Sequence, residues 1–253
     1  MLPPPQCEHE WNRVVNKDST CTEVGEAVLT CTKCGEKKTE EIPLHHYVDY
    51  KCKDCSAWGK GPAGGYVFYD KGSYSDGWRY LEAAPADLRL IRGVPTVDSS
   101  ADGYDEATKK FIFGYYWESF TSSDSSVVGT SIGIGTGKTN TEKLVEVMGT
   151  KHAFGIQKPV SNAAPRLDYA AKLCDILVYT TAEGKTYGDW FLPSLNELKR
   201  MSTELPGTLD FSENNSYCTS SESGNDEAHC YCPGVNSSAA RNHGASIRPI
   251  RAF

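Results

Sequence analysis

Apolar and aromatic residues gather in a few short segments of this chain, and their spacing predicts strands at both ends of its larger part. The segment GGYVFYD at 64–70 is rich in aromatic and β-branched residues, which favours an extended strand. The last eight residues, SIRPIRAF at 246–253, alternate as a strand with one buried face does. A further apolar segment, FIFGYYWESF, lies at 111–120.

Between these two predicted strands, apolar residues recur at the spacing of helices. Thr139 with Glu142 and Ser194 with Glu197 form capping boxes, so a helix is expected to begin at each. A third helix is expected in APRLDYAAKLCDIL, with Cys174 as a buried filler on its apolar face. The other positions expected to face inward are Leu144, Val147 and Met148 in one helix and Leu195, Leu198 and Met201 in another. Helices between an early and a late strand predict an α+β fold.

The segment before the final strand has neither period. Residues 217–245 read YCTSSESGNDEAHCYCPGVNSSAARNHGA, a run of small polar residues with three cysteines. Such a composition is typical of exposed loops.

The bulk composition is that of an acidic globular protein. The chain has 253 residues, a formal net charge of −7 and 39% hydrophobic residues, which suits one large domain or a domain with a small appendage. The acidic balance argues against a nucleic-acid partner, because proteins that bind phosphate backbones carry a basic face. No segment is apolar over the length that spans a bilayer, and MLPPPQC shows no signal peptide.

The glycine-rich segment IGIGTGKTN at 132–140 does not match a nucleotide-binding loop. A P-loop has a glycine five positions before the glycine of Gly-Lys-Thr. Here Gly137 precedes Lys138, and the earlier position is Ile132.

The cysteines indicate a separate unit at the start of the chain. Six of the ten cysteines lie before residue 60, whereas a single disulfide framework would be spread through the fold. Cys31 and Cys34 form one C-x-x-C pair, and Cys52 and Cys55 form a second one after a gap in the zinc-ribbon range. The sequence therefore predicts a zinc-ribbon-like unit at 1–60, in which these four thiolates hold a structural zinc ion.

Other assignments of these side chains stay open. The two pairs could instead form local or crossed disulfides or be plain thiols. Five further donors lie nearby and could replace one of the four ligands or form a second site: Cys7, His9, Cys21, His45 and His46. The segment GKGPAGG at 59–65 is typical of a linker to the rest of the chain.

Several ordered segments of the remainder resemble a known family. They are GGYVFYDKGSYSDGWRYLEAAPADL, IGTGKTNTEKLV, AAKLCD, GDWFLPSLNEL, Y-x-x-SSE and SIRPIRAF. Together they resemble the C-type lectin-like domains of the formylglycine-generating-enzyme subtype, in particular the treponemal variable proteins that a retroelement diversifies. The resemblance covers roughly residues 60–253 and implies a C-type lectin-like fold over 61–253, after the cysteine-rich unit.

The resemblance implies a use for the polar segment near the C-terminus. In such proteins a reverse transcriptase rewrites adenines in the last part of the gene, so that asparagine codons come to encode many amino acids. The fold holds these positions on an exposed face as a ligand-binding site, here at about 214–246. Tyr, Ser, Gly and Asn suit such a face, because they supply adaptable contacts on a rigid support. The positions expected to contact a ligand are Cys218, Ser223, Asn225, Asp226, His229, Tyr231, Ser237, Asn242 and His243.

The neighbouring residues are expected to form the scaffold of that face. They are Tyr217, Ser221, Glu222, Arg248, Pro249, Arg251 and Phe253. Arg248 and Arg251 are expected to pair with carboxylates beneath the loops.

The amino-acid usage of the polar segment is consistent with this diversification. Changing both adenines of an asparagine codon reaches fifteen amino acids but never Lys, Glu, Gln, Met or Trp. Between Asn214 and Ser246 only Glu222 and Glu227 belong to this unreachable set, whereas average usage would place about six such residues there. Cys218, Cys230 and Cys232 then fit as products of mutagenesis.

Two other functions suit these residues less well. The oxidase that gives the fold subtype its name implies two catalytic cysteines with four residues between them, but Cys230 and Cys232 are separated by one. A calcium-dependent sugar-binding lectin needs clustered oxygen ligands. The Glu-Pro-Asn, Gln-Pro-Asp and Trp-Asn-Asp motifs of those lectins are absent, and Asn225-Asp226-Glu227 is the only local cluster. We therefore expect a binding protein without enzymatic activity.

The resemblance also implies where such a protein is found and what it binds. It implies display on the bacterial cell surface as an outer membrane lipoprotein, with a protein or glycan ligand on a host or neighbouring cell. Membrane contact would come only through a lipid anchor, although Cys7 lacks the small apolar run expected before a lipidated cysteine.

Overall fold

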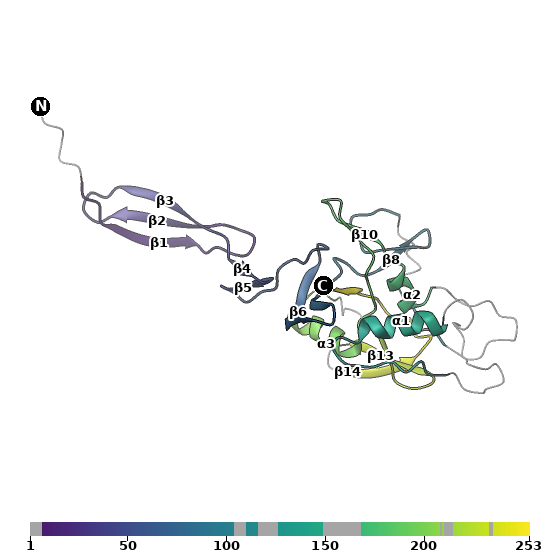
Figure 1. Ribbon diagram of the computed structural model, residues 1–253. Helices are drawn as coiled ribbons and strands as arrows, with labels where there is room; N and C mark the ends of the chain where they lie inside the picture. Colours follow the sequence, from purple (N-terminus) through teal and green to yellow (C-terminus); the bar gives the residue numbers. More distant parts are fainter. Residues whose placement is uncertain are drawn as a thin grey trace, which may run out of the picture. The chain divides into compact units, whose positions relative to one another are not determined.

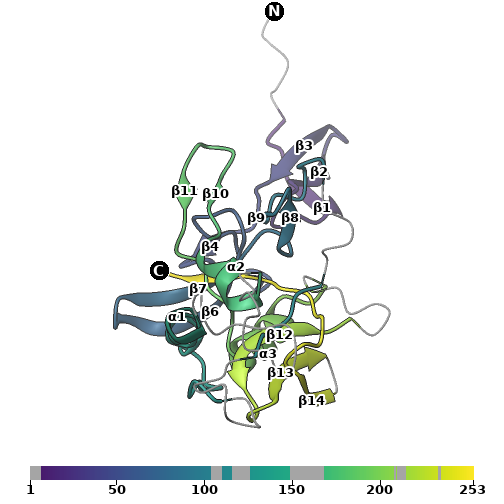
Figure 2. The same ribbon diagram turned by 90° about the vertical axis from the view of Figure 1, so that its right-hand side faces the viewer.

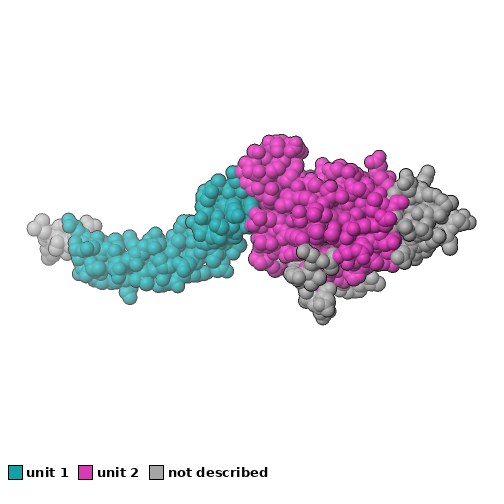
Figure 3. All heavy atoms as spheres, turned by 90° about the horizontal axis from the view of Figure 1, so that it is seen from below, with its two compact units in different colours: residues 1–59 teal, residues 60–253 magenta. Residues whose placement is uncertain are grey.

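The chain divides into two compact units. The computed structural model describes residues 7–103, 110–115, 126–148, 168–207, 209, 215–232 and 235–253, with the side chains of 235–237 excepted. Figure 3 colours the units, Met1–Gly59 and Lys60–Phe253, which we call unit 1 and unit 2.

Unit 1 is built on a three-stranded antiparallel sheet in the order β1-β2-β3 (Figure 1). Its strands are β1 (Trp11–Lys17), β2 (Gly25–Cys31) and β3 (Lys37–Ile42), followed by a short hairpin of β4 (Tyr47–Val48) and β5 (Lys51–Cys52). Trp11 pairs with Cys31, and Gly25 pairs with Ile42, so β2 is hydrogen-bonded on both edges along its length.

Unit 1 buries very little apolar surface. Of its described residues, those that are buried are Gly25, Ala27, Cys31 and Cys52. None of these side chains is larger than that of cysteine, and β1 and β3 are exposed along almost their whole length. A unit of this size without a hydrophobic core needs another source of stability.

Unit 2 joins the first and last strands predicted from the sequence in one sheet, with the order β15-β7-β6. Its strands are β6 (Tyr66–Ser75), β7 (Trp78–Ala83) and β15 (Ile250–Ala252). The hairpin between β6 and β7 turns at Asp76 and Gly77, whose φ values of 51° and 81° fit the turn type that Asp-Gly favours. Both predicted strands are thus confirmed, the first longer and the second shorter than expected.

Two small hairpins lie elsewhere in unit 2. They are formed by β8 (Arg89–Ile91) with β9 (Val94–Thr96), and by β10 (Tyr179–Thr180) with β11 (Thr186–Tyr187).

Helix α3 (Leu195–Glu204) begins at the predicted capping box. Ser194 Oγ accepts the N–H of Glu197 at 3.3 Å, and Glu197 Oε2 accepts the N–H of Ser194 at 2.7 Å. The residues expected to face inward are all buried: Leu195, Leu198 and Met201.

Helix α1 (Gly137–Met148) begins two residues before the box predicted at Thr139, so that prediction was wrong. The carboxylate at its start belongs to Glu197 of α3: Oε1 accepts the N–H of Gly137, the first residue of the helix, at 3.4 Å and that of Gly135, before the helix, at 2.8 Å. The sequence pattern failed because the acceptor comes from a segment some sixty residues away. Leu144 and Met148 are buried as expected, and Val147 is half-buried.

Helix α2 (Ala170–Asp175) is the described part of the third predicted helix. Cys174 is fully buried in the core of unit 2, which confirms its assignment as an apolar filler. Part of that segment, and part of the apolar segment at 111–120, lies outside the described residues.

The polar segment near the C-terminus forms a sheet where the sequence predicted loops. Figure 2 shows its three antiparallel strands, in the order β12-β13-β14. They are β12 (Tyr217–Glu222), β13 (Glu227–Cys232) and β14 (Val235–Ala240). The residues of β12 are buried from Tyr217 to Ser221, so this strand shows no alternation of apolar and polar residues.

The core of unit 2 lies where helices α1 and α2 pack against β12. Helix α3 contacts β12, β13 and β6. Small antiparallel sheets with few helices make a mixed fold that is compatible with the predicted α+β class. Among the described helices, none has the length and apolar character needed to cross a membrane.

Candidate functional site

Unit 1 contains two separate groups of cysteine and histidine side chains that could bind a metal ion. The first is Cys7, His9, Cys31 and Cys34, and the second is Cys21, His45, Cys52 and Cys55. Within each group the four donor atoms lie within 4.8 Å of one another. Either group could hold a metal ion.

The two C-x-x-C pairs therefore do not meet in one site, as the sequence had suggested. Cys31 and Cys34 lie in the first group, and Cys52 and Cys55 lie in the second. The sheet explains the separation. Cys31 ends β2, whereas Cys21 precedes that strand, and seven residues of β-strand extend over about 20 Å. The spacing of cysteines along the chain does not contain this information.

The two C-x-x-C turns share one backbone pattern. The N–H of Gly35 donates to Cys31 O, and that of Ser56 donates to Cys52 O. In each turn the residue after the second cysteine has a positive φ, 74° at Gly35 and 62° at Ser56. Backbone N–H groups also approach the sulfurs, from Lys33 to Cys31 and from Cys55 to Cys52, both at 3.4 Å. Unit 1 thus carries the same local turn twice.

These surroundings favour the thiolate form of the first cysteine in each turn. Burial raises the pKa of Cys31, but hydrogen bonds from the backbone of Cys34 and the side chain of His9 outweigh it and lower the pKa to about 5. Burial of Cys52 is likewise outweighed by the backbone of Cys55 and its neighbours, which lowers the pKa to about 7. Thiolates are the form of cysteine that binds metal.

Histidine completes each group. His9 Nδ1 lies 3.4 Å from the sulfur of Cys34, and His45 Nδ1 lies 3.6 Å from that of Cys21. His46 belongs to neither group. Its backbone N–H donates to Asp54 Oδ2 at 2.8 Å, which helps to hold the second turn.

In unit 2, Glu222 joins the C-terminal sheet to the loop before α1. Its carboxylate accepts the N–H groups of Val128 and Gly129 at 2.8 Å and that of Thr130 at 3.1 Å. The same carboxylate pairs with Arg241 Nη2 at 2.8 Å. This agrees with the expectation that Glu222 belongs to the scaffold.

Arg241 is the partner that the sequence analysis missed. Its side chain is fully buried, donates to Gly224 O at 2.8 Å and lies over the ring of Phe113 at 5.2 Å. Burial lowers the pKa of its guanidinium, against the opposing effect of Glu222. The only signal in the sequence is one arginine within a long tract of small polar residues.

Exposure along β13 follows the pleat of the strand. Glu227, His229 and Tyr231 are exposed or half-exposed, whereas Ala228 and Cys230 are buried. His229 pairs with Ser238 of β14, and the side chain of Ser238 donates to the carboxylate of Glu227. One side of this strand therefore presents polar side chains, and the other packs on the core.

Most of the residues expected to contact a ligand are accessible. Ser223, Asn225, Asn242 and His243 are exposed, and Asp226, His229 and Tyr231 are half-exposed; we call these seven the rim residues. Ser237 pairs with Cys230 in the sheet, and its side chain lies outside the described part of the structure. The backbone N–H of Arg241 donates to Asp226 O at 3.1 Å, which joins the two turns that carry rim residues.

Cys218 is the exception, because it lies in the core. Its side chain is only 2% exposed, and its sulfur donates to Phe111 O at 3.3 Å. It pairs with Cys230, which is also buried. A small, weakly polar thiol fits such a position, so Cys218 offers no surface to a ligand in this structure.

A shallow surface hollow, without room for a water molecule, lies at the C-terminal sheet. Its lining brings together Phe113, Cys218, Thr219, Ala228, His229, Cys230, Ala240 and His243. Two rim residues, His229 and His243, therefore border one hollow.

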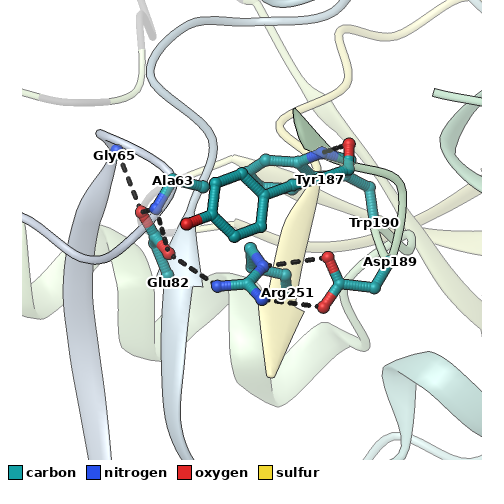
Figure 4. A network of polar contacts seen from close by, with 7 residues as sticks. All are labelled: Ala63, Gly65, Glu82, Tyr187, Asp189, Trp190 and Arg251. Atoms are coloured by element: carbon teal, nitrogen blue, oxygen red, sulfur yellow. Dashed lines mark hydrogen bonds and ion pairs between the residues drawn. The ribbon is translucent and has the colours of Figure 1, made fainter. Parts of the chain in front are cut away.

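The two C-terminal arginines pair with carboxylates, as predicted. Arg248 Nε lies 2.6 Å from Asp87 Oδ1. Figure 4 shows that the guanidinium of Arg251 lies between Glu82, at 3.2 Å, and Asp189, at 2.8 Å, beneath the ring of Tyr187.

The carboxylate of Glu82 fixes the start of unit 2 to this arginine. It accepts the N–H groups of Ala63 and Gly65, each at 3.0 Å (Figure 4). Burial raises the pKa of Glu82 despite Arg251 nearby. A side chain at Gly65 would place its Cβ 1.7 Å from Ala83 O, so this position requires glycine. Arg251 of the last strand, β15, is therefore held by an ion pair on each side.

The structure also shows where the residues considered for an oxidase and for a calcium-dependent lectin lie. Cys230 is buried, which raises its pKa to about 11, and Cys232 is half-buried two residues along the same strand. Within the described ranges of unit 2, Asp226 and Glu227 join no group of three His, Cys, Asp or Glu donors that could hold a metal.

Comparison of the chain with protein family models, curated proteins and solved structures finds no match. The family resemblance consequently depends on the sequence segments alone.

Proposed function

We propose that this protein is a non-enzymatic binding protein, in which a C-type lectin-like domain displays a diversified ligand-binding site on its C-terminal sheet. The single observation that carries the proposal is the contrast between Glu222 and the rim residues. Glu222 makes four short contacts to buried or backbone groups, whereas the rim residues are accessible.

The contrast matches what adenine mutagenesis can and cannot change. Glutamate is out of reach of a mutated asparagine codon, and Glu222 is the glutamate on which the sheet and the loop at 128–130 converge. All seven rim residues belong to the reachable set. A site of this kind needs a fixed frame and tolerant side chains, as antibody loops do.

The chemistry of the rim suits a polar partner. Ser223, Asn225 and Asn242 offer hydroxyl and amide groups, while His229 and Tyr231 offer rings with a polar atom. Tyrosine supplies a large contact area at a low entropic cost. The partner is proposed to be a protein or a glycan on a host or neighbouring cell.

Unit 1 is proposed to hold zinc in a structural role. Sets of cysteine and histidine donors suit this ion, and the described residues of unit 1 form no hydrophobic core that could stabilise it otherwise. Display on the bacterial surface through a lipid anchor completes the proposal, with the resemblance in sequence as its support.

A display library tests the binding function. The rim residues vary over the amino acids that an asparagine codon can reach, and folded variants are selected on an immobilised globular protein such as serum albumin. We expect binders whose affinity depends on the rim. A matched library that varies Glu222 and Arg241 together with their contacts should give unfolded protein. Equal yields of folded binders from both libraries would contradict the proposal.

The DNA that follows the gene tests the diversification. We expect a near-copy of the 3′ end that differs only at adenines, beside a reverse transcriptase gene. A downstream region without either would remove diversification from the proposal and leave the binding function to the display experiment.

A further inference from the structure

We infer that unit 1 binds two zinc ions, one at each end of its three-stranded sheet, each held by three thiolates and one imidazole. The first site consists of Cys7, His9, Cys31 and Cys34, and the second of Cys21, His45, Cys52 and Cys55. This inference goes beyond the proposed binding function and is independent of any ligand.

The spacing of the donor atoms fits tetrahedral zinc. Bonds of about 2.3 Å to sulfur and about 2.0 Å to nitrogen place two sulfurs about 3.8 Å apart, and a sulfur and a nitrogen about 3.5 Å apart. The sulfurs of Cys21 and Cys55 lie 3.4 Å apart, and the sulfur–nitrogen distances are 3.4 Å in the first group and 3.6 Å in the second. All ten cysteines are unbonded, so these are not disulfide distances.

The second ring nitrogen of His9 is held as in known zinc sites. His9 Nδ1 faces the sulfur of Cys34, while Nε2 lies 3.3 Å from Glu36 Oε2. Metal-ligating histidines usually donate their other N–H to a carboxylate or a carbonyl, which fixes the tautomer. The ring also stacks on Trp11 at 4.8 Å. His9 is therefore oriented for metal binding by groups that are not ligands themselves.

Each ion would join segments that the sheet leaves loose. Cys7 and His9 precede β1, and the first ion would tie them to the turn after β2. Cys21 lies between β1 and β2, and His45 follows β3, so the second ion would tie both connections to the β4–β5 hairpin. Because unit 1 has almost no apolar core, the two ions would supply most of its folding free energy.

The inference also constrains the lipid anchor. A cysteine whose thiolate binds zinc cannot carry a lipid on the same sulfur. If the protein is lipidated, Cys7 is not the attachment point in the zinc-loaded form.

The number of bound ions tests the inference directly. Native mass spectrometry of the full chain, purified with zinc, should give two ions per chain. Cys7→Ser and Cys21→Ser should each reduce this to one, and the double variant to none. A single site made of Cys31, Cys34, Cys52 and Cys55 would instead give one ion and leave both single variants unaffected, which would overturn the inference. Cys232→Ser, in unit 2, is the control and should keep two ions.

Thiol labelling of the unaltered protein covers the case in which a variant fails to fold. With zinc bound, alkylation should spare the six cysteines of unit 1 and modify Cys232, and chelation should expose all six. Protection of only four, or disulfides between these cysteines in protein purified with zinc, would refute the two-site arrangement. None of these results depends on ligand binding, so failure here is distinguishable from failure of the proposed function.

Discussion

The sheet of unit 1 and the C-terminal sheet of unit 2 have the same number of strands in the same order, but they differ in what stabilises them. Around β2, buried side chains are no larger than cysteine, and two groups of metal donors flank the sheet. Strand β12 is buried along five of its residues and contacts helices, and its last residue, Glu222, pairs with the buried Arg241. Under the proposed metal sites, the polar sequence of unit 1 is ordered by metal ligands, whereas that of the C-terminal sheet is ordered by the buried contacts of Glu222 and Arg241.

Removal of metal should have the largest effect, and it should affect the sheet of unit 1 but not that of unit 2. Chelation with EDTA is expected to unfold unit 1, since structural zinc sites contribute on the order of 10 kcal/mol each. The core of unit 2 involves no metal donors of unit 1, so its unfolding temperature should not change. Amide NMR spectra before and after chelation would show dispersion lost for the described residues of unit 1, 7–59, and for no residue of unit 2. A simultaneous collapse of unit 2 would contradict this division, and added zinc should restore the first spectrum.

Breaking the buried ion pair should have the next largest effect. Glu222→Gln leaves the guanidinium of Arg241 buried without its charge partner, which costs about 3–5 kcal/mol. Glu227→Gln makes the same chemical change at an exposed position of the same sheet and should cost less than about 0.5 kcal/mol. Urea unfolding of unit 2 in saturating zinc measures both. Equal losses in the free energy of unfolding would mean that Glu222 stabilises the sheet no more than an exposed glutamate does.

The cap of α3 should have a moderate effect. Ser194→Ala removes the acceptor for the N–H of Glu197 and the hydrogen bond to Gly133 O at 2.7 Å. We expect a loss of about 1–2 kcal/mol in the free energy of unfolding of unit 2. Ser202→Ala in the same helix is the matched control, with an expected change below about 0.5 kcal/mol. Unit 1 should keep its metal content in both variants.

The smallest predicted effect is a dependence on pH at the rim. Burial lowers the pKa of His229, Lys199 acts in the same direction, and Glu227 opposes both. A histidine whose pKa is lowered by folding stabilises the protein above its ordinary pKa of about 6.5, and this contribution is lost as the pH falls toward the folded value. Between about pH 7.5 and about pH 5.5, the unfolding temperature of unit 2 should therefore fall more in the unaltered protein than in His229→Asn.

Tyr231→Asn is the control for this measurement, because it changes the next outward-facing residue of the strand without removing the titrating group. It should follow the pH dependence of the unaltered protein. If His229→Asn does the same, the titration of His229 does not contribute to the pH dependence of stability, and the prediction is wrong.

Local patterns predicted the parts of the fold that depend on neighbouring residues. The capping box at Ser194, the burial of Cys174 and both terminal strands follow from short segments and are confirmed. The start of α1 was misplaced because the N–H of Gly137, its first residue, and that of Gly135 before it are accepted by Glu197 from a distant segment. The residues around the start of α1 do not indicate such a distant acceptor.

The candidate sites show the same limit. The C-x-x-C pairs identified candidate metal donors, but only the sheet places one pair at each end. The polar tract gave no apolar period because β12 buries Thr219, Ser220 and Ser221, whose hydroxyl groups all make hydrogen bonds. A buried strand whose side chains are mostly hydroxyl groups in a hydrogen-bond network has the composition of a loop.

The most direct test of the central claim compares the replacement of several rim residues with the single replacement Glu222→Gln. The four exposed rim residues, Ser223, Asn225, Asn242 and His243, are replaced together by alanine, and the free energy of unfolding of unit 2 is measured in urea. If the contacts of Glu222 and Arg241 hold the sheet and the rim residues do not, the total loss in the free energy of unfolding should be below about 2 kcal/mol. This loss should be smaller than that from Glu222→Gln alone. A loss in the quadruple variant that equals or exceeds that of Glu222→Gln would contradict the account, because the rim would then be part of what holds the sheet together.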